Sequence, residues 1–279
     1  MRFDNEVQFA GTKIHYLEWN GTSGKHVLLV HGLTSNSHAW VKLGDRLSSE
    51  GFHVIAPDLR GRGLSVGPPH GYGVPFHSAD LLSLSDASGL EKFSIVGHSL
   101  GGIIGLYMTA LYPDRVEKFT LVDVGIRLPP DTIQAISASL NRLGQVFPSL
   151  DAYLDMARKI PYYAWNEFWD QYYRYDAMVR SDGTVISRVS KSAIQEELAT
   201  NATLNEEVLP PLIRVPTLIL KAARGTLGPD SGLLLTREEA TRLSGMIKGS
   251  EIKEISGTNH YTIITSEDFE KEVSVFLQK

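Results

Sequence analysis

Short apolar runs rich in β-forming residues alternate along this chain with longer segments in which apolar residues recur every three or four positions. Short runs with little polar interruption are typical of strands that are buried on both faces. The longer repeat is typical of helices with one buried side. The predicted strands span residues 13–19, 26–30, 54–57, 93–96, 118–122, 217–220 and 251–255. The predicted helices span residues 37–49, 76–88, 100–112, 236–248 and 266–277.

The order of these elements predicts the fold class. Strands that alternate with helices form parallel βαβ units, in which helices cover both faces of the sheet. We therefore expect an α/β fold with an open, mostly parallel sheet of about eight strands, the first of them antiparallel. The alternation stops between residues 126 and 211, so a helical cap is predicted after the sixth strand. The expected core comprises residues 1–126 and 211–279, and the expected cap residues 127–210.

Aromatic residues are concentrated in one part of the expected cap. Its stretch "IPYYAWNEFWDQYYRYDAMV" holds seven Tyr or Trp residues and one Phe in twenty positions. Such side chains either pack the cap helices together or line an apolar ligand pocket. The candidates for lining a pocket are Tyr162, Trp165 and Trp169 from the cap, and His98 from the core.

Composition excludes several classes of protein. The net charge of -5 argues against a nucleic-acid partner, because nucleic-acid binders usually carry a basic face. The absence of cysteine excludes disulfides, thiolate metal sites and a cysteine nucleophile, and it fits a reducing compartment. No apolar run reaches the roughly 18 residues of a membrane span, and the first residues do not resemble a signal peptide. We therefore expect a cytoplasmic protein without a membrane partner.

The strongest chemical signal is the stretch "FSIVGHSLGGIIGLYMTALYP". It contains a G-x-S-x-G pattern, from Gly97 to Gly101, between a predicted strand and a predicted helix. This context is that of a nucleophile elbow, in which a serine sits on a sharp turn and the glycines allow strand and helix to approach closely. Ser99 is therefore the candidate nucleophile.

Two backbone N–H groups are candidates for stabilising an oxyanion. Leu100 follows the serine at the positive N-terminal end of a helix. Leu33 follows His31 and Gly32 directly after a predicted strand, in "HVLLVHGLTSNSHAW". His31 itself is interpreted as structural, because a base so close to this loop is badly placed to take the proton of the serine.

The candidate general base is His260, which follows the last predicted strand in "IKEISGTNHYTII". A histidine after that strand reaches the same edge of the sheet as the serine. The earlier "GRGLSVG" lacks the spacing of a dinucleotide fingerprint and no metal-ligand motif occurs, so no cofactor and no metal are expected.

The chain resembles the α/β-hydrolase family, in its cap-bearing branch of esterases, lactonases and carbon–carbon hydrolases. The resemblance covers the whole chain and rests on "HGLTSNSHAW", "VIAPDLRGRGLS", "GHSLGG", "YPDRVEKFTLVD" and "GTNH". It implies a serine nucleophile, a histidine base, an acid that orients the histidine, and no cofactor. The family's usual acid follows the strand at residues 217–220, but Gly225 occupies that place.

Two carboxylates could replace the missing acid. Asp123 ends "KFTLVD", at the carboxyl edge of the neighbouring strand, where some branches of the family place the acid. Asp230 lies in the loop after the later strand, where an aspartate beside glycines is typical of a solvated turn. We favour Asp123 and keep Asp230 in reserve.

The predicted function is that of a serine hydrolase that cleaves a small carboxylic ester or lactone through an acyl-enzyme, similar to a carboxylesterase. The alternatives are hydrolysis of an amide-like or carbon–carbon bond, as in the branch that hydrolyses acetamidomethylene-succinate, and a non-catalytic receptor of the same fold. A dicarboxylate would need basic partners from the cap. The available residues are Arg142, Arg158, Lys159, Arg174 and Arg180.

Overall fold

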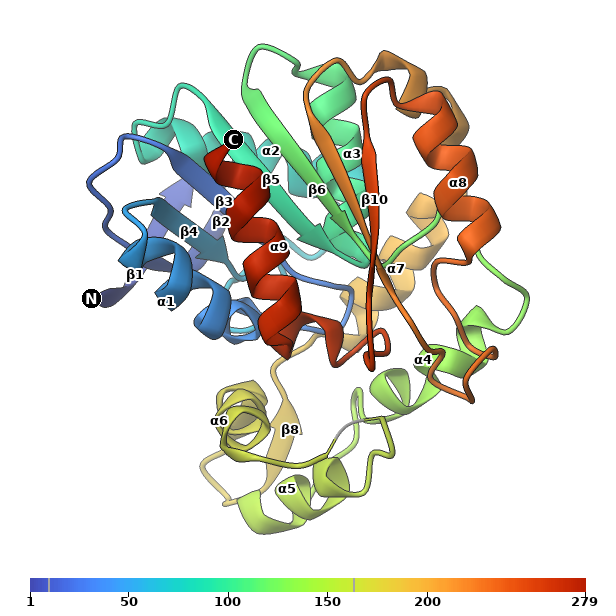
Figure 1. Cartoon of the computed structure of the whole chain (residues 1–279). Helices are drawn as coiled ribbons and strands as arrows, with labels where there is room; N and C mark the ends of the chain where they lie inside the picture. Colours follow the sequence, from blue (N-terminus) through green and yellow to red (C-terminus); the bar gives the residue numbers. More distant parts are fainter. Residues whose placement is uncertain (10, 163) are drawn as a thin grey trace.

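An eight-stranded sheet runs through the centre of the computed structural model, which describes residues 1–9, 11–162 and 164–279 (Figure 1). The strand order is β1-β2-β4-β3-β5-β6-β9-β10. The pairs β1–β2 and β2–β4 are antiparallel and the other neighbours are parallel, which confirms the predicted fold class. The strands are β1 (Arg2–Phe9), β2 (Thr12–Trp19), β3 (His26–Val30), β4 (His53–Pro57), β5 (Phe93–His98), β6 (Val116–Val122), β9 (Thr217–Ala222) and β10 (Glu251–Ile255).

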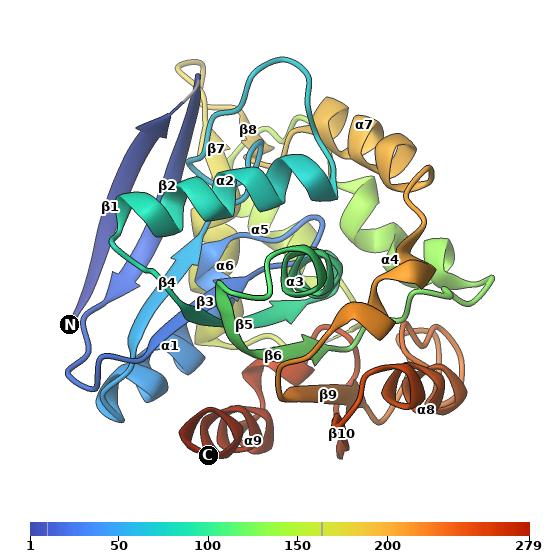
Figure 2. The ribbon, with the colours of Figure 1, turned by 90° about the horizontal axis from the view of Figure 1, so that it is seen from above.

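Helices cover both faces of this sheet (Figure 2). On β3, Val27 and Leu29 pack in one hydrophobic cluster, while Leu28 and Val30 pack in the other. Because successive side chains point to opposite faces and both faces are buried, apolar residues are favoured at successive positions of such a strand. One face carries α1 (Val41–Ser49) and α9 (Glu267–Gln278), and the other carries α2 (Val74–Ala87), α3 (Leu100–Leu111) and α8 (Arg237–Met246).

Seven strands and five helical segments lie where the pattern predicts them, and their ends differ by at most two residues. The strand β1 is absent from that prediction. It pairs only with β2, and its side chains are exposed or half-buried, so it needs no continuous apolar run. Polar residues such as Asp4 and Glu6 can therefore occupy it.

The chain between β6 and β9 forms a cap below the carboxyl ends of the parallel strands (Figure 1). It includes a small hairpin, which the sequence pattern does not predict because strands of three residues are too short to give a pattern. The expected boundaries at residues 127 and 210 stay a prediction. The cap elements are α4 (Thr132–Asn141), α5 (Leu150–Arg158), α6 (Glu167–Asp176), β7 (Ala177–Val179), β8 (Val185–Ser187) and α7 (Lys191–Asn201).

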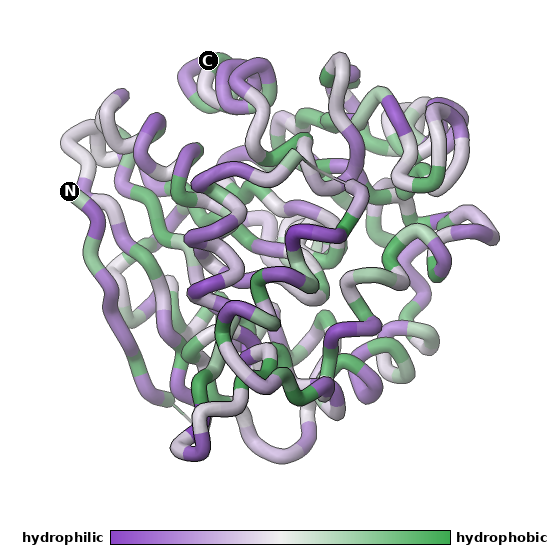
Figure 3. The backbone as a smooth tube through the Cα atoms, turned by 90° about the horizontal axis from the view of Figure 1, so that it is seen from below, coloured by the Kyte–Doolittle hydropathy of each residue, from purple (hydrophilic) through white to green (hydrophobic). Residues whose placement is uncertain are grey.

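Hydrophobic and hydrophilic stretches alternate along the chain when it is viewed from the cap side (Figure 3). In the part of the chain that the structure describes, no helix combines the length and apolar character needed to cross a membrane.

A buried ionic cluster joins the cap to the core. Glu197 of α7 accepts hydrogen bonds from Arg62 and contacts His77 Nε2 at 2.9 Å, and all three side chains are fully buried. Burial raises the pKa of Glu197, but the charges of Arg62 and His77 outweigh it and hold the pKa at about 2. The carboxylate is therefore ionised and fixes α7 against the core.

We predict that Glu197→Ala lowers the free energy of unfolding by about 3–5 kcal/mol, because it leaves a buried charge without its partner. Denaturant unfolding followed by circular dichroism measures this change. The control Gln195→Ala, at an exposed position of the same helix, should stay within about 0.5 kcal/mol of wild type. Equal unfolding midpoints for the two variants would contradict the structural role of Glu197.

Candidate active site

Ser99 forms a strained turn between β5 and α3. Its φ of 56° and ψ of -125° lie in a region that non-glycine residues rarely occupy. A Cβ at Gly97 would lie 2.1 Å from the Gly101 carbonyl oxygen, and a Cβ at Gly101 would lie 2.0 Å from the Val30 carbonyl oxygen. The turn can therefore form only with glycine at both positions, as the elbow pattern predicts.

The two predicted oxyanion donors lie beside this turn. Leu33 and Leu100 line the same cavity as Ser99. The loop after β3 approaches the serine closely, since a Cβ at Gly32 would lie 3.1 Å from Ser99 Cβ. Among the described residues, none accepts a hydrogen bond from the Leu33 or Leu100 N–H. Both donors are thus available to a bound group.

The side chain of His31 contacts the peptide group that joins Gly32 to Leu33. Its Nδ1 lies 2.8 Å from the Gly32 carbonyl oxygen, and its Nε2 accepts a hydrogen bond from Leu59 N at 3.0 Å. Complete burial lowers the pKa of His31 to about 4, so the ring is neutral at neutral pH. Arg62 Nε donates to the Leu33 carbonyl at 3.1 Å. These contacts give His31 the structural position expected from the sequence.

His260 and Asp123 are in direct contact. His260 Nδ1 lies 2.9 Å from Asp123 Oδ2, and both side chains are buried. A carboxylate only accepts hydrogen bonds, so Nδ1 carries the proton and Nε2 is the acceptor nitrogen of the neutral ring. His260 also lines the cavity that contains Ser99.

Hydrogen bonds to the backbone of β9 hold both the main chain and the side chain of Asp123. It has a φ of 50°, and with Ser99 it is one of two described non-glycine residues with a positive φ. Its N–H donates to the Leu220 carbonyl at 2.8 Å, and its Oδ1 accepts from Ala222 N at 2.8 Å. One residue earlier, the Val122 carbonyl accepts from Ser99 N at 3.0 Å. The bend that ends β6 therefore positions the carboxylate relative to the serine turn.

Asp230, the reserve candidate for the acid, lies away from His260. Asp230 is exposed in the loop after β9, and among the described residues it contacts neither His260 nor the cavity. The loop folds back on itself at Gly225, where a Cβ would lie 1.9 Å from the Ser231 carbonyl oxygen. This closure leaves no room for a side chain at the position where the family resemblance implies an acid.

Two residues hold the backbone of the His260 loop. His98 Nε2 lies 2.8 Å from the His260 carbonyl oxygen, and burial lowers the pKa of His98 well below its ordinary value. Asn259 Oδ1 accepts from Tyr261 N at 3.0 Å, and its Nδ2 donates to the Tyr162 carbonyl at 2.6 Å. Asn259 thus links this loop to the cap. The role of Asn259 was not predicted from the sequence, although this residue directly precedes His260 in "GTNH".

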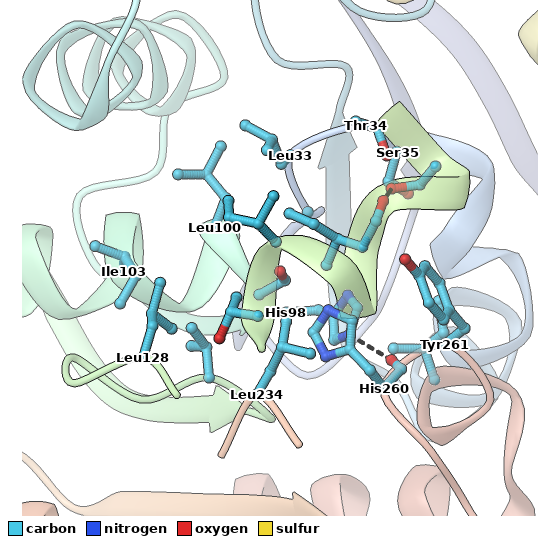
Figure 4. Close-up of a pocket in the computed structure, with 18 of the residues that line it drawn as sticks. Leu33, Thr34, Ser35, His98, Leu100, Ile103, Leu128, Leu234, His260 and Tyr261 are labelled. Carbon is cyan, nitrogen blue, oxygen red and sulfur yellow. Dashed lines mark hydrogen bonds between the residues drawn. The ribbon is translucent and has the colours of Figure 1, made fainter. Parts of the chain in front are cut away.

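A cavity of about 210 Å³ lies over Ser99 (Figure 4). Figure 4 shows Ile103 and Leu128 on one side of His98, and Ser35 and Tyr261 on the other. The first side is apolar, whereas the second combines hydroxyl and aromatic groups. Further lining residues include Val124, Ile133, Ile136, Ser139, Arg142, Tyr172, Tyr173, Leu198, Glu206, Leu234 and Ile264.

The predicted pocket residues divide into two groups. His98 and Trp169 line the cavity, whereas Tyr162 and Trp165 lie outside its lining. Tyr162 stacks on Tyr261 with ring centroids 4.9 Å apart, and Trp165 stacks on a tyrosine of α6. Tyr162 therefore packs the cap against the loop after β10, and Trp165 packs within the cap, so both follow the packing interpretation and not the pocket interpretation.

Arg142 is the basic cap residue that lies in the cavity lining. Its Nη2 donates to the Thr34 carbonyl at 2.5 Å, its Nη1 to the Ser139 carbonyl at 2.6 Å, and its Nε faces Asp176 at 3.4 Å. Asp176 is fully buried and balances the charge of the guanidinium. Arg158, Lys159, Arg174 and Arg180 are not in the lining that the structure describes.

The described residues contain no group of three His, Cys, Asp or Glu side chains arranged to hold a metal ion.

The sequence profile of the alpha/beta hydrolase fold matches residues 25–266. The chain therefore belongs to the alpha/beta hydrolase family, which confirms the resemblance seen in the sequence. Its eight-stranded sheet and flanking helices are those of this fold.

Several hydrolases are similar to this chain in sequence. The 2-(acetamidomethylene)succinate hydrolase of Mesorhizobium japonicum is 35% identical over 130 residues, which are 47% of this chain and 46% of that protein. The 3-hydroxybutyrate-oligomer hydrolase of Cupriavidus necator is 33% identical over 131 residues, 46% of this chain and 44% of that protein. These matches span less than half of the length of either relative.

A solved structure of E-2-(acetamidomethylene)succinate hydrolase has a TM-score of 0.85 and 23% identity to this chain, with both chains fully covered. The enol-lactonase from Burkholderia xenovorans has a TM-score of 0.73 and 20% identity, and the match covers 99% of this chain and 100% of that one. At 20–23% identity, the similarity of these two structures to this chain shows a shared fold.

We predict that Gly101→Ala lowers the free energy of unfolding by about 3 kcal/mol, because the new methyl group would overlap the Val30 carbonyl and push α3 away from the sheet. Gly245→Ala is the control, since a Cβ there meets no atom within 4 Å inside α8. It should stabilise the protein by about 0.5–1 kcal/mol. Denaturant unfolding of both variants measures the difference; a tolerated Gly101→Ala would contradict the close approach.

Proposed function

We propose that this protein is a serine hydrolase that cleaves small carboxylic esters through an acyl-enzyme. The observation that carries the proposal is the contact between His260 Nδ1 and Asp123 Oδ2, within the site that contains Ser99. This contact leaves Nε2 as the proton acceptor, which is the tautomer that a general base for a serine requires.

The first half of the reaction forms the acyl-enzyme. Ser99 Oγ attacks the carbonyl carbon of the ester while His260 Nε2 takes the hydroxyl proton. Asp123 stabilises the resulting imidazolium, and the N–H groups of Leu33 and Leu100 donate to the oxyanion. The tetrahedral intermediate then collapses, the bond to the alkoxy oxygen breaks, and His260 returns the proton to the leaving alcohol.

The second half of the reaction releases the acid. A water molecule attacks the acyl carbon while His260 takes one of its protons, and the same N–H groups stabilise the second oxyanion. The bond to Ser99 Oγ then breaks and the serine regains its proton. Carboxylic acid and alcohol are the products.

The lining of the cavity supports an apolar acyl group. Ile103, Val124, Leu128 and Leu234 lie on its walls, and a cavity of about 210 Å³ suits a small ester or a lactone. Burial of acyl carbon atoms against these side chains contributes roughly 0.8 kcal/mol for each methylene.

A second candidate is hydrolysis of a dicarboxylate with an amide-like bond, the class that the name of the Mesorhizobium relative indicates. Arg142 favours it, because a guanidinium in the cavity could bind a substrate carboxylate. However, each of the three nitrogens of Arg142 already has a partner, in Thr34, Ser139 or Asp176, and Asp176 balances its positive charge. We therefore favour the ester.

The proposal predicts a definite order among three variants assayed with p-nitrophenyl acetate, butyrate and octanoate. Ser99→Ala and Asp123→Asn should lower kcat by about 10³-fold or more while remaining folded by circular dichroism. The matched control Asp230→Asn, at the exposed reserve position, should stay within about twofold of wild type.

Either of two results would refute this assignment. If Asp230→Asn loses activity and Asp123→Asn keeps it, the acid is misassigned. If wild type hydrolyses none of the three esters, the dicarboxylate candidate, assayed with 2-(acetamidomethylene)succinate, takes precedence over the esterase.

A further inference from the structure

Glu206 brings an unpartnered carboxyl group to the cavity over Ser99. It begins the short 3-10 helix η2 (Glu206–Val208), which follows α7, and it is half-buried in the cavity lining. Among the described residues, none donates a hydrogen bond to this carboxyl group or forms an ion pair with it. The described lining also contains His98, His260 and Arg142. His98 contacts the His260 carbonyl, His260 contacts Asp123, and Arg142 is balanced by Asp176.

The neighbouring Glu207, on the same turn, differs from Glu206 because both of its carboxylate oxygens accept hydrogen bonds. Its Oε1 accepts from Arg127 Nε at 2.8 Å, and its Oε2 accepts from Arg242 Nη1 at 2.7 Å. Arg242 also donates to both oxygens of Glu239 at 2.7 Å. The basic groups around η2 are thus engaged by Glu207 and Glu239, and Glu206 faces the cavity without a counter-charge.

This placement of Glu206 affects both the pKa of its carboxyl group and the stability of the free protein. Burial, and after it the like charge of Glu207, raises the pKa of Glu206 to about 7. A partly buried carboxyl without a hydrogen-bond partner is destabilising for the free protein. A ligand that supplies the missing donor would remove that penalty, and unfavourable groups of this kind concentrate at functional sites.

We propose that Glu206 is a specificity-determining residue that binds an ammonium group on the substrate, so that the enzyme prefers esters carrying a primary amine away from the scissile carbonyl. The inference rests on the proposed ester hydrolysis for its substrate class. An ammonium supplies both the positive charge and the N–H donors that the carboxylate lacks, and hydrogen bonds between charged partners are about twice as strong as neutral ones.

The first test measures binding without catalysis. Hexylammonium is the probe, and isothermal titration calorimetry at pH 8 compares wild type with Glu206→Gln. The expected result is binding that weakens by about tenfold in the variant, because the amide keeps the shape and loses the charge. Glu117→Gln, an exposed position on β6, removes the same net charge and should bind as wild type does.

The second test measures selectivity. The probes are p-nitrophenyl 6-aminohexanoate and p-nitrophenyl heptanoate, which differ in ammonium against methyl at the chain end. Wild type should favour the amino ester in kcat/KM, and Glu206→Gln should lower that preference about tenfold while keeping the heptanoate rate within about threefold. The preference should also rise about fivefold from pH 6 to pH 8, as Glu206 ionises and the amine stays protonated.

The other titrating or charged groups near Glu206 do not produce that pH effect. Arg127 and Arg242 pair with Glu207 and Glu239 in one ionic cluster, and the step at His260 is common to both esters, so its contribution cancels in the ratio of kcat/KM. Equal hexylammonium binding by wild type and Glu206→Gln, or an amino-ester preference that survives in the variant, would overturn the inference. Absence of any ester hydrolysis with intact hexylammonium binding would instead refute the proposed function alone.

Discussion

The contact between Asp123 and His260 is the interaction around which the candidate site is arranged. It joins the end of β6 to the loop after β10, across the intervening strand β9. Asp123 reaches this position because its backbone bends at a positive φ and because Ala222 N holds its second carboxylate oxygen. The carbonyl of Val122, one residue earlier, holds Ser99 N. The end of β6 thus positions both the Asp123 carboxylate and the turn at Ser99.

The cap contributes to the same arrangement through buried polar contacts. Arg62 donates both to the Leu33 carbonyl and to Glu197 of α7, so the loop after β3 and a cap helix share one guanidinium. Arg142 links the cap to the Thr34 carbonyl in the same loop. Movement of the cap would therefore be transmitted to the loop after β3. Two buried guanidinium groups therefore join the cap to the loop after β3.

The pattern of the sequence predicts most of the fold because the central strands are buried on both faces. It predicts the turn at Ser99 for a local reason, since the glycines on either side are required by close backbone contacts. The choice between Asp123 and Asp230 depends instead on which strand ends meet at His260, so sequence reasoning could only rank them. Asn259 escaped prediction because its role depends on a contact with the distant Tyr162, and Glu206 because its place in the cavity lining depends on how distant segments come together. No local pattern records either.

The most direct test of the account is the proton NMR signal of the hydrogen bond between His260 and Asp123. An imidazole proton held by a buried carboxylate resonates far downfield of the amide protons, and its loss in His260→Gln would assign it. The account predicts that the signal disappears in folded Asp123→Asn and persists in Asp230→Asn. A signal assigned to His260 that persists in Asp123→Asn would show that another group holds the histidine, and would contradict the central claim.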